Sequence, residues 1–521
     1  MSEHKKITGY LSSVTIATGI SRILGYMRDM LVAQVFGAGL FADAFYAAYR
    51  IPNLFRRLLG EGSVSASFVP VFSEYVQTKE KKDIQELLNV VFTVLTVILL
   101  TITILGIIFA KPLTKIIAFG FTSTPEKLNI AILLTKIMFP YLLFACLAAL
   151  LLGVLNSLKS FFLPAVAPAS LSISEIFCVL VVFSIFRLTD VQKIYLLAIS
   201  VVVGGFGQYF VQQLKVHRFN LKIRLDFNLN HPGLRKILTL LVPTMIGFSV
   251  DQVNAFVDTI CASFLREGSI TALYYSNRVM QLPLALFGIA MATVSLPLMS
   301  YSIAENNIQK MKDTLNFSLR MVIFALMPAS IGLITLGLPI IRALFEHGKF
   351  DFQASKLTYS ALLFYSCGLV SFSFVKVTAS AFYSMKETKI PVKIAVLCMA
   401  LNVILNIILM KPLGVGGLAL ATTISSSLNA FLLIYNLRKK IGQIGAKKIL
   451  NSFLKILVAS LIMGATVLIL SKLDYTYKII QVFITITIGI IIYFLMSKFL
   501  NIEERKPLLE LLKEKFSLGD E

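Results

Sequence analysis

Apolar segments long enough to cross a lipid bilayer follow one another along almost the whole sequence. A membrane-spanning helix needs about 20 mostly apolar residues, because the hydrocarbon layer is about 30 Å thick. The segments leave no polar stretch long enough to form a soluble domain. The sequence therefore predicts an all-α, polytopic integral membrane protein with 14 transmembrane helices. We place them near 9–35, 42–72, 87–110, 130–156, 161–186, 192–214, 237–264, 271–300, 317–341, 357–383, 390–410, 414–437, 449–471 and 477–499.

The composition agrees with a membrane protein. The chain is 57% hydrophobic and 15% charged, whereas soluble domains average about 45–50% apolar and about 25% charged residues. The net charge of +22 does not indicate a nucleic-acid partner, because the basic residues alternate with apolar segments instead of gathering on a soluble module. The five cysteines lie singly within apolar segments and lack metal-ligand spacing, so we expect them to be small buried residues.

Basic connections set the orientation and the domain boundaries. Cytoplasmic loops of membrane proteins are enriched in Lys and Arg, and the most basic connections, at 215–236 and 436–448, fall on the same side as both termini. We therefore expect both termini in the cytoplasm. The predicted domains are an N-lobe at 1–220, a C-lobe at 221–440, a final helix pair at 441–500 and a cytoplasmic amphipathic tail at 501–521.

The two predicted lobes share short sequence echoes. The stretch AFYAAYRIP is echoed by ALYYSNRVM, so that Arg50 corresponds to Arg278. Downstream, SFVPVFS is echoed by SLPLMSY, which brings Pro70 near the position of Pro297. Two copies of a six-helix unit are typical of transporters whose site lies between the repeats.

Charged residues interrupt the first, second and eighth predicted spans. Asp43, Arg50 and Arg57 are seven residues apart and therefore share one helix face, over roughly 21 Å of helix. Arg22 and Asp29 in the first span are also seven apart. A charge at the centre of a bilayer costs several kcal/mol, so such residues indicate function.

Arginine exceeds acid in these three spans. Pairing of Asp29 with Arg28, Asp43 with Arg50 and Glu61 with Arg57 would neutralise only half of the arginines. The remaining positive charge has to face water or an anion, and the planar guanidinium group suits phosphate or carboxylate. These spans therefore predict a wet cationic cavity for an anionic, phosphorylated ligand. The six arginines are Arg22, Arg28, Arg50, Arg56, Arg57 and Arg278, against Asp29, Asp43 and Glu61.

A second polar group lies in the other predicted lobe. Asp258 occupies the middle of the seventh span, Asn402 and Asn406 lie one turn apart on the eleventh, and Thr422 lies on the twelfth. One carboxylate with amide and hydroxyl oxygens suits a hard monovalent cation such as Na+. Ordinary hydrogen bonds between helices explain the same residues, so the sequence leaves both interpretations open.

No signature of an enzyme emerges. The four histidines lie in tails or loops, and the chain has neither a Gly-rich phosphate loop nor a cluster of Asp and His facing a membrane surface. We therefore predict no catalytic residues and, apart from a coupling ion, no cofactor.

Seven motifs occur in an order that resembles a known family: SRILGYMRD, FGAGLFADAF, RIPNLFRRLLGEG, SFVPVFSEY, LYYSNRVMQLP, HGKFD and AFYSMKETKIPVKIA. Together they resemble the bacterial lipid II flippases of the MurJ (MviN) family, in the multidrug/oligosaccharidyl-lipid/polysaccharide (MOP) exporter superfamily. The resemblance extends from about residue 10 to about residue 440. The last two spans agree with the family in position more than in letters.

The resemblance implies two pseudo-symmetric six-helix lobes, a central cationic cavity, and a final helix pair that forms a groove for a lipid tail. The implied function is alternating-access transport of lipid II, an undecaprenyl-diphosphate-linked disaccharide-pentapeptide, from the inner to the outer leaflet of the cytoplasmic membrane. Membrane lipids and other cell-wall synthesis proteins are the further partners expected. The implied substrate-binding residues are Ser21, Arg22, Arg28, Asn53, Arg56 and Arg278, with Asp29, Asp43, Glu61, Arg50 and Arg57 as gate or charge-pair residues.

The same resemblance places Asp258, Asn402, Asn406 and Thr422 at positions where some relatives bind sodium. Asn406 stands where an acid can occur, so fewer negative charges would meet the cation here.

Four other functions are compatible with parts of this pattern. A flippase for another polyprenyl-linked sugar, such as an O-antigen or capsule unit, would have a similar cavity. A drug–cation antiporter shares the fold, but the surplus of arginine opposes it. A scaffold for cell-wall enzymes would not need arginines within the membrane, and a membrane transferase would need acid/base residues that the chain lacks.

Overall fold

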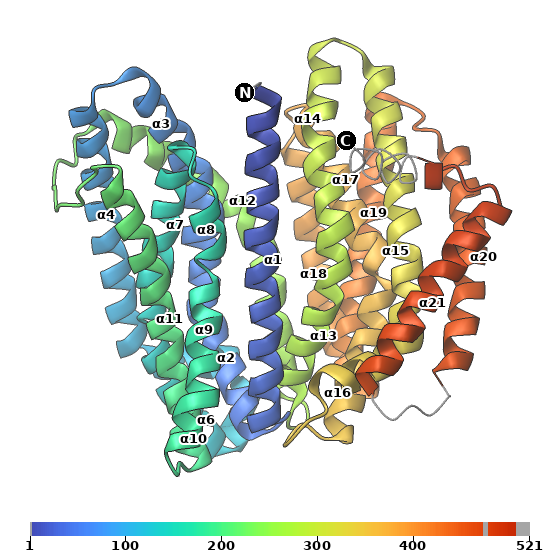
Figure 1. Cartoon of the computed structure of the whole chain (residues 1–521), viewed down its shortest axis with the longest axis horizontal. Coiled ribbons are helices and arrows are strands. Elements are labelled where there is room, and N and C mark those ends of the chain that lie inside the picture. The colour runs from blue at the N-terminus through green and yellow to red at the C-terminus, as the bar shows by residue number, and fades with distance from the viewer. Residues whose placement is uncertain (1–2, 472–477, 507–521) are drawn as a thin grey trace, which may run out of the picture. The chain divides into compact units, whose positions relative to one another are not determined.

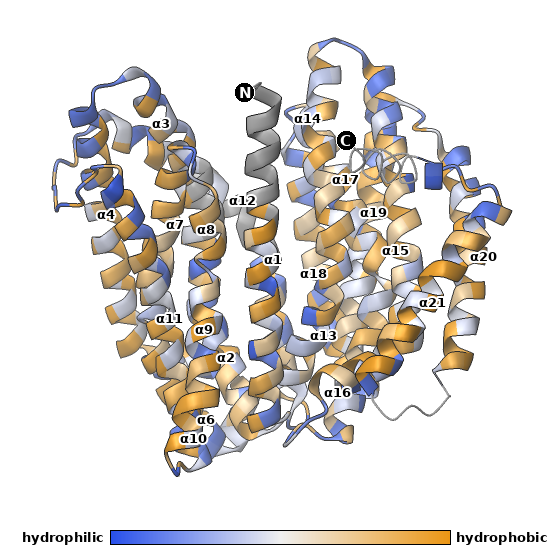
Figure 2. Ribbon diagram, in the orientation of Figure 1, coloured by the Kyte–Doolittle hydropathy of each residue, from blue (hydrophilic) through white to orange (hydrophobic). Residues whose placement is uncertain are grey.

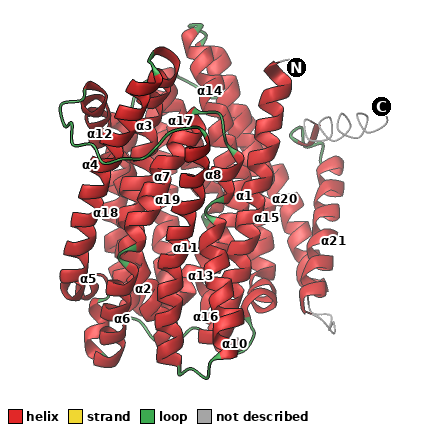
Figure 3. Ribbon diagram, turned by 60° about the vertical axis from the view of Figure 1, so that its left-hand side comes forward, coloured by secondary structure: helices red, strands yellow, loops and turns green. Residues whose placement is uncertain are grey.

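The computed structural model describes residues 3–471 and 478–506, and this part of the chain consists of helices joined by loops, without any strand (Figure 3). The contacts divide the chain into two units: unit 1 comprises residues 1–270 with 348–350, and unit 2 comprises 271–347 with 351–521. The predicted tail at 501–521 falls mostly on residues 507–521, outside the described residues.

Unit 1 contains α-helices, two π-helical segments (η1 and η3) and one 3-10 segment (η2). In chain order they are α1 (Glu3–Phe36), α2 (Leu40–Phe55), η1 (Arg56–Val64), α3 (Ser65–Thr78), α4 (Lys81–Ile108), α5 (Ala110–Ile117), η2 (Phe119–Ser123), α6 (Pro125–Met138), α7 (Tyr141–Ser157), α8 (Phe162–Val166), α9 (Ala169–Phe177), η3 (Cys178–Val182), α10 (Phe183–Ile185), α11 (Asp190–Arg218) and α12 (Pro232–Ser263) (Figure 1).

Unit 2 contains longer helices and one π-helical segment, η4. In chain order they are α13 (Ser269–Pro283), which begins just before the boundary, η4 (Leu284–Ile289), α14 (Ala290–Ala304), α15 (Ile308–Phe345), α16 (Phe352–Cys367), α17 (Leu369–Ser384), α18 (Lys389–Leu413), α19 (Val415–Ile441), α20 (Ala446–Leu470) and α21 (Lys478–Phe499).

Each predicted span falls on one helix or on a run of consecutive helices, which confirms the all-α membrane fold. Within residues 3–471 and 478–506, nine helices are long and apolar enough to cross a membrane, and the pair α16–α17, bent by 45°, makes a tenth. Neither α1 nor the run α2–η1–α3 is among them. In the coloured part of the α1 ribbon, blue hydrophilic positions alternate with orange apolar ones (Figure 2). The total of 14 crossings stays a prediction.

The first long basic connection is folded against α4. Three polar side chains on α4, four residues apart, accept hydrogen bonds from the backbone N–H groups of alternate loop residues. The spacings match, because four helical residues and two extended residues both advance about 6–7 Å. The bonds join Lys222 N–H to Gln85 Oε1 (2.7 Å), Arg224 N–H to Asn89 Oδ1 (3.0 Å) and Asp226 N–H to Thr93 Oγ1 (2.8 Å).

The division of the chain by contacts does not test the predicted boundary between the lobes, which stays a prediction. The sequence places it at 220, inside this connection, but α12 packs against α3, η1 and α5 and belongs to unit 1. The connection does not behave as a linker, since its backbone is bonded to α4. The continuous part of unit 1 ends at Ile270.

The sequence echoes correspond to one local architecture found in both units. Each echo covers an α-helix, a π-helical segment and a second α-helix: α2–η1–α3 in unit 1 and α13–η4–α14 in unit 2. The π-helical segment begins six residues after the arginine in both cases, at residue 56 after Arg50 and at residue 284 after Arg278. Pro70 and Pro297 lie in the second α-helix of each run.

In unit 2, α15 packs against α20 and α21, and their apolar side chains form one core. The Tyr493 hydroxyl donates to the Phe324 carbonyl across this core (2.7 Å). Arg320 binds the buried Glu504 carboxylate at one end of α21. At the other end, Lys478 binds Glu346 (2.9 Å). The final helix pair is thus attached to α15 at both ends of α21.

Candidate functional site

One group of buried charges of the site lies between α1 and α9. Arg28 donates to Asp29 Oδ1 through both Nε (3.0 Å) and Nη2 (2.6 Å). Its Nη1 reaches Oε1 of Glu175 on α9, at 3.5 Å. Asp29 is 1% exposed and Glu175 is 4% exposed. The predicted pair Arg28–Asp29 is confirmed, and a second carboxylate joins it.

A second charged group surrounds Asp43 on α2. Its Oδ2 accepts hydrogen bonds from Lys127 Nζ of α6 (2.8 Å) and from the Gly268 N–H (2.8 Å). Asp43 is 1% exposed and Lys127 is 7% exposed, and the ammonium group also lies 4.4 Å from the centre of the Phe121 ring. The structure therefore gives Asp43 a buried lysine partner that the sequence did not suggest.

Gly268 can make this bond because it lacks a side chain. Its φ of +88° lies in the left-handed region, and a Cβ atom would come within 2.4 Å of the Ala38 carbonyl oxygen. The backbone next to it also takes part, since Glu267 accepts a hydrogen bond from the Leu40 N–H at the start of α2. The turn after α12 is thus bonded to the first turns of α2.

The remaining arginines of α2 and η1 have polar partners close by. Arg50 Nε donates to the Thr259 hydroxyl of α12 (3.1 Å), and Arg56 Nε donates to Asn53 Oδ1 (3.0 Å). The predicted substrate-binding residues Asn53 and Arg56 therefore lie together. Arg50 and Arg57 do not continue along one α-helical face, because Arg57 lies in the π-helical segment η1. There its side chain is exposed.

Two arginines of the site have no ion-pair partner within the described part of the chain. These are Arg22 on α1 and Arg57 on η1, both exposed. Ser21, next to Arg22, is half-buried. The side chain of Glu61, the predicted partner of Arg57, lies outside the described residues.

Sequence reasoning missed three residues of this site: Glu175, Lys127 and Thr259. A signal existed for Glu175, because it is a lone acid in the apolar stretch SLSISEIFCVL, and an acid within a span is a candidate functional residue. Lys127 sits at the start of a predicted span, where a lysine usually reaches the interface. Glu175 adds one negative charge and Lys127 one positive charge, so the positive surplus of the site is the same as the sequence count indicates.

The predicted residues of unit 2 fall into two places. Arg278 is half-buried on α13. Asn402 and Asn406 on α18 and Thr422 on α19 lie together: Asn402 Nδ2 donates to Thr422 Oγ1 (3.2 Å), and Asn406 Nδ2 donates to Asn402 Oδ1 (3.2 Å). Asp258, the only carboxylate of the predicted cation set, belongs to unit 1.

Two oxygens of the predicted cation set are engaged in these bonds. Asn402 Oδ1 and Thr422 Oγ1 each accept an amide hydrogen, so the arrangement fits hydrogen bonding between α18 and α19. Binding of Na+ would require the two amide groups to turn their oxygens toward the ion. Sodium coupling stays a prediction.

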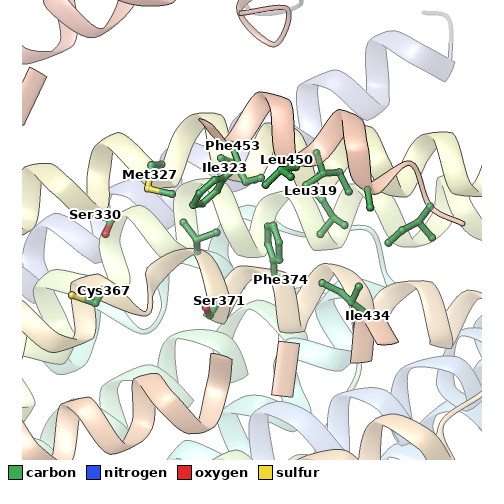
Figure 4. A pocket seen from close by; sticks show the side chains of 14 residues that line it. Leu319, Ile323, Met327, Ser330, Cys367, Ser371, Phe374, Ile434, Leu450 and Phe453 are labelled. Atoms are coloured by element: carbon green, nitrogen blue, oxygen red, sulfur yellow. The ribbon is translucent and has the colours of Figure 1, made fainter. Parts of the chain in front are cut away.

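An apolar cavity of about 570 Å³ lies within unit 2, between α20 and the lobe helices α15, α17 and α19. The side chains of Leu319, Ile323, Phe374, Leu450 and Phe453 point into it (Figure 4). Three polar groups, from Ser330, Cys367 and Ser371, interrupt this lining. The cavity is suited to a hydrocarbon chain.

Comparison with known proteins decides the family. A family model described as "Lipid II flippase MurJ" matches residues 32–488. This chain belongs to the MurJ family. It is 36% identical to the "Probable lipid II flippase MurJ" of Buchnera aphidicola subsp. Schizaphis graminum, over 94% of this chain and 96% of the relative. It is 34% identical to the "Lipid II flippase MurJ" of Burkholderia cenocepacia, over 82% and 83%.

Solved structures agree with the MurJ assignment. A structure described as "Lipid II flippase MurJ, inward closed conformation" superposes with a TM-score of 0.77 and 30% identity, covering 93% of this chain and 98% of that chain. A multidrug resistance transporter of the MATE family, in the MOP superfamily, superposes with a TM-score of 0.68 at 13% identity and so shares the fold alone. The chain is therefore a multi-pass membrane protein with the transporter fold of the MurJ family.

Proposed function

We propose that this chain transports lipid II from the inner to the outer leaflet of the bacterial cytoplasmic membrane by alternating access, with both termini in the cytoplasm. The observation that carries the proposal is the set of arginines on α1, α2 and η1, of which Arg22 and Arg57 have no acidic partner among the described residues. A membrane protein retains such charges at a high energetic cost only for a ligand or for water. The relatives reported above are named "Probable lipid II flippase MurJ" and "Lipid II flippase MurJ".

The diphosphate of the substrate would bind the arginines. Arg22, Arg28 and Arg56 offer guanidinium forks, and Asn53 already orients Arg56 through its 3.0 Å hydrogen bond. Arg278 stays among the predicted ligands. We expect Arg278→Ala to lose transport while the protein is still made in normal amounts.

The polyprenyl tail of the substrate would remain in apolar surroundings. The cavity beside α20 is lined mainly by apolar side chains and has a volume of about 570 Å³ (Figure 4). It lies next to the final helix pair that the family resemblance assigns to the tail. We propose that part of the hydrocarbon chain occupies this cavity during transport.

Binding of defined lipids to purified protein tests the proposal. Lipid II is compared with undecaprenyl phosphate and with an O-antigen-type lipid, for wild type, Arg28→Ala and Arg28→Lys, across a salt series. We expect preferential binding of lipid II that weakens with salt, is lost in Arg28→Ala and is partly kept in Arg28→Lys, because lysine keeps the charge without the fork. Arg235→Ala removes an exposed arginine of α12 and is the matched control.

Two outcomes would contradict the proposal. Equal binding of all three lipids would contradict lipid II as the specific substrate. Preference for the O-antigen-type lipid would assign the chain to transport of another polyprenyl-linked sugar.

A further inference from the structure

Arg28 has more negative charge around it than a structural ion pair needs. Asp29 binds the Nε and Nη2 edge of the guanidinium group at 3.0 and 2.6 Å. Both donors meet the same oxygen, Asp29 Oδ1, so this contact already pairs the guanidinium group with a carboxylate. Glu175 nevertheless places a second carboxyl group at Nη1, so one guanidinium group meets two carboxyl groups in a buried place.

The two carboxylates hold Arg28 very differently. The contact to Glu175 is 3.5 Å long, at the limit of a hydrogen bond, whereas the shortest contact to Asp29 is 2.6 Å. Asp29 is the neighbouring residue on α1, while Glu175 comes from α9, 147 positions away. Breaking the contact to Glu175 therefore costs less interaction free energy than breaking the contact to Asp29.

Among the described residues, Arg28 is the one hydrogen-bond partner of the Glu175 carboxyl group. The neighbours of Glu175 in the sequence are apolar or weakly polar, and the nearby Ser174 hydroxyl bonds to the Ser200 carbonyl of α11 (2.8 Å) without involving Glu175. A buried carboxylate is expensive unless it is well paired. An acid within a predicted membrane span is a candidate functional residue, so we expect Glu175 to take part in transport.

We propose that Glu175 competes with the ligand for Arg28. Without ligand, Glu175 contacts Nη1 of Arg28, and a phosphate group of the ligand displaces it. When the ligand dissociates, Glu175 contacts Arg28 again. Glu175 is thus a positioning residue that acts through Arg28. The inference rests on the proposed function, because it assumes that Arg28 binds the anionic part of the transported lipid. The ligand chemistry that it requires is a phosphate or diphosphate group.

This role predicts opposite effects on affinity and on turnover. Without the competing carboxylate, a phosphate reaches Arg28 more easily, but nothing helps to expel it afterwards. Glu175→Gln should therefore bind lipid II at least about fivefold more tightly, because the contact to a charged partner no longer has to be broken. It should also transport lipid II more slowly at saturating substrate.

The experiment compares wild type, Glu175→Gln, Arg28→Ala and the double variant, each checked for folding by thermal unfolding. Glu74→Gln is the matched control, since it removes the same charge from an exposed ion pair of unit 1, with Lys236 at 3.2 Å. The probes are lipid II, undecaprenyl phosphate and inorganic pyrophosphate. The last probe shows whether the phosphate groups alone displace Glu175, without the lipid. Glu175→Ala serves as a second variant if Gln prevents folding.

Tighter binding in Glu175→Gln that disappears in the double variant, together with slower turnover, supports the inference. Weaker or unchanged binding in a folded Glu175→Gln overturns it, as does equal tightening in Glu74→Gln. If wild type binds pyrophosphate through Arg28 but does not prefer lipid II, the result contradicts the proposed function. The competition between Glu175 and phosphate for Arg28 would still hold. The two proposals can therefore fail separately.

Discussion

The buried ion pair between Asp43 and Lys127 allows the most quantitative prediction for stability. The two charged groups are 2.8 Å apart and almost completely buried. Removing one member of a buried pair leaves the other charge without compensation, which costs about 3–5 kcal/mol. Asp43→Asn still offers an oxygen to the Gly268 N–H, so we attribute most of its cost to the stranded lysine.

A double-mutant cycle measures this pair directly. The singles are Asp43→Asn and Lys127→Met, and we expect each to lower the free energy of unfolding by about 3 kcal/mol or more. Because the double variant contains no stranded charge, it should lose about as much as one single variant, which gives a coupling of about 3 kcal/mol. Reversible unfolding in mixed micelles with increasing SDS provides the free energies. Strict additivity of the two single losses would refute the assigned pair.

Two further predictions concern single positions. Gly268→Ala should destabilise the protein by about 1–3 kcal/mol, because a non-glycine residue is strained at φ +88° and its Cβ would meet the Ala38 carbonyl. The control is Gly19→Ala, which should be neutral or stabilising because no atom lies within 4 Å of the new Cβ. Equal melting temperatures of the two variants would contradict this prediction. Glu346, at the end of α15, is partly buried, which alone would raise its pKa, but hydrogen bonds from Arg342, Lys478 and Ser355 lower the pKa below its usual value of 4.5. A carboxyl group with a lowered pKa stabilises the fold above pH 4.5, and this contribution disappears as the pH falls through the lowered pKa. Glu346→Gln should therefore melt below wild type at pH 7, by an amount corresponding to about 1 kcal/mol, and the difference should vanish in acid; a difference that persists at low pH would show another cause.

Much of the fold could be predicted because hydropathy is a local property. Each predicted span falls on helix, and the pair Arg28–Asp29 follows from neighbouring positions in the sequence. The echo of Arg50 in Arg278 also locates two corresponding helix–π–helix runs. The π-helical geometry itself was not predictable, because it adds one residue to a turn without a distinctive composition.

The contacts that complete the site come from distant parts of the chain. Lys127 and Glu175 lie 84 and 147 residues from the charges that they bind, and only the packing of α6 and α9 brings them close. The contacts of the first long basic connection are also distant in the sequence. The basic connection looks like a linker in the sequence, yet Gln85, Asn89 and Thr93 on α4 bind its backbone.

Transport by the purified protein tests the central claim most directly. Lipid II carrying a label on its head group is placed in proteoliposomes, and an impermeant reagent reports how fast the label appears on the opposite leaflet. We predict that wild type accelerates this step far above protein-free liposomes, and that Arg28→Ala reduces it to the background rate. The account would be contradicted if wild type were no faster than protein-free liposomes, or if Arg28→Ala transported lipid II as fast as wild type.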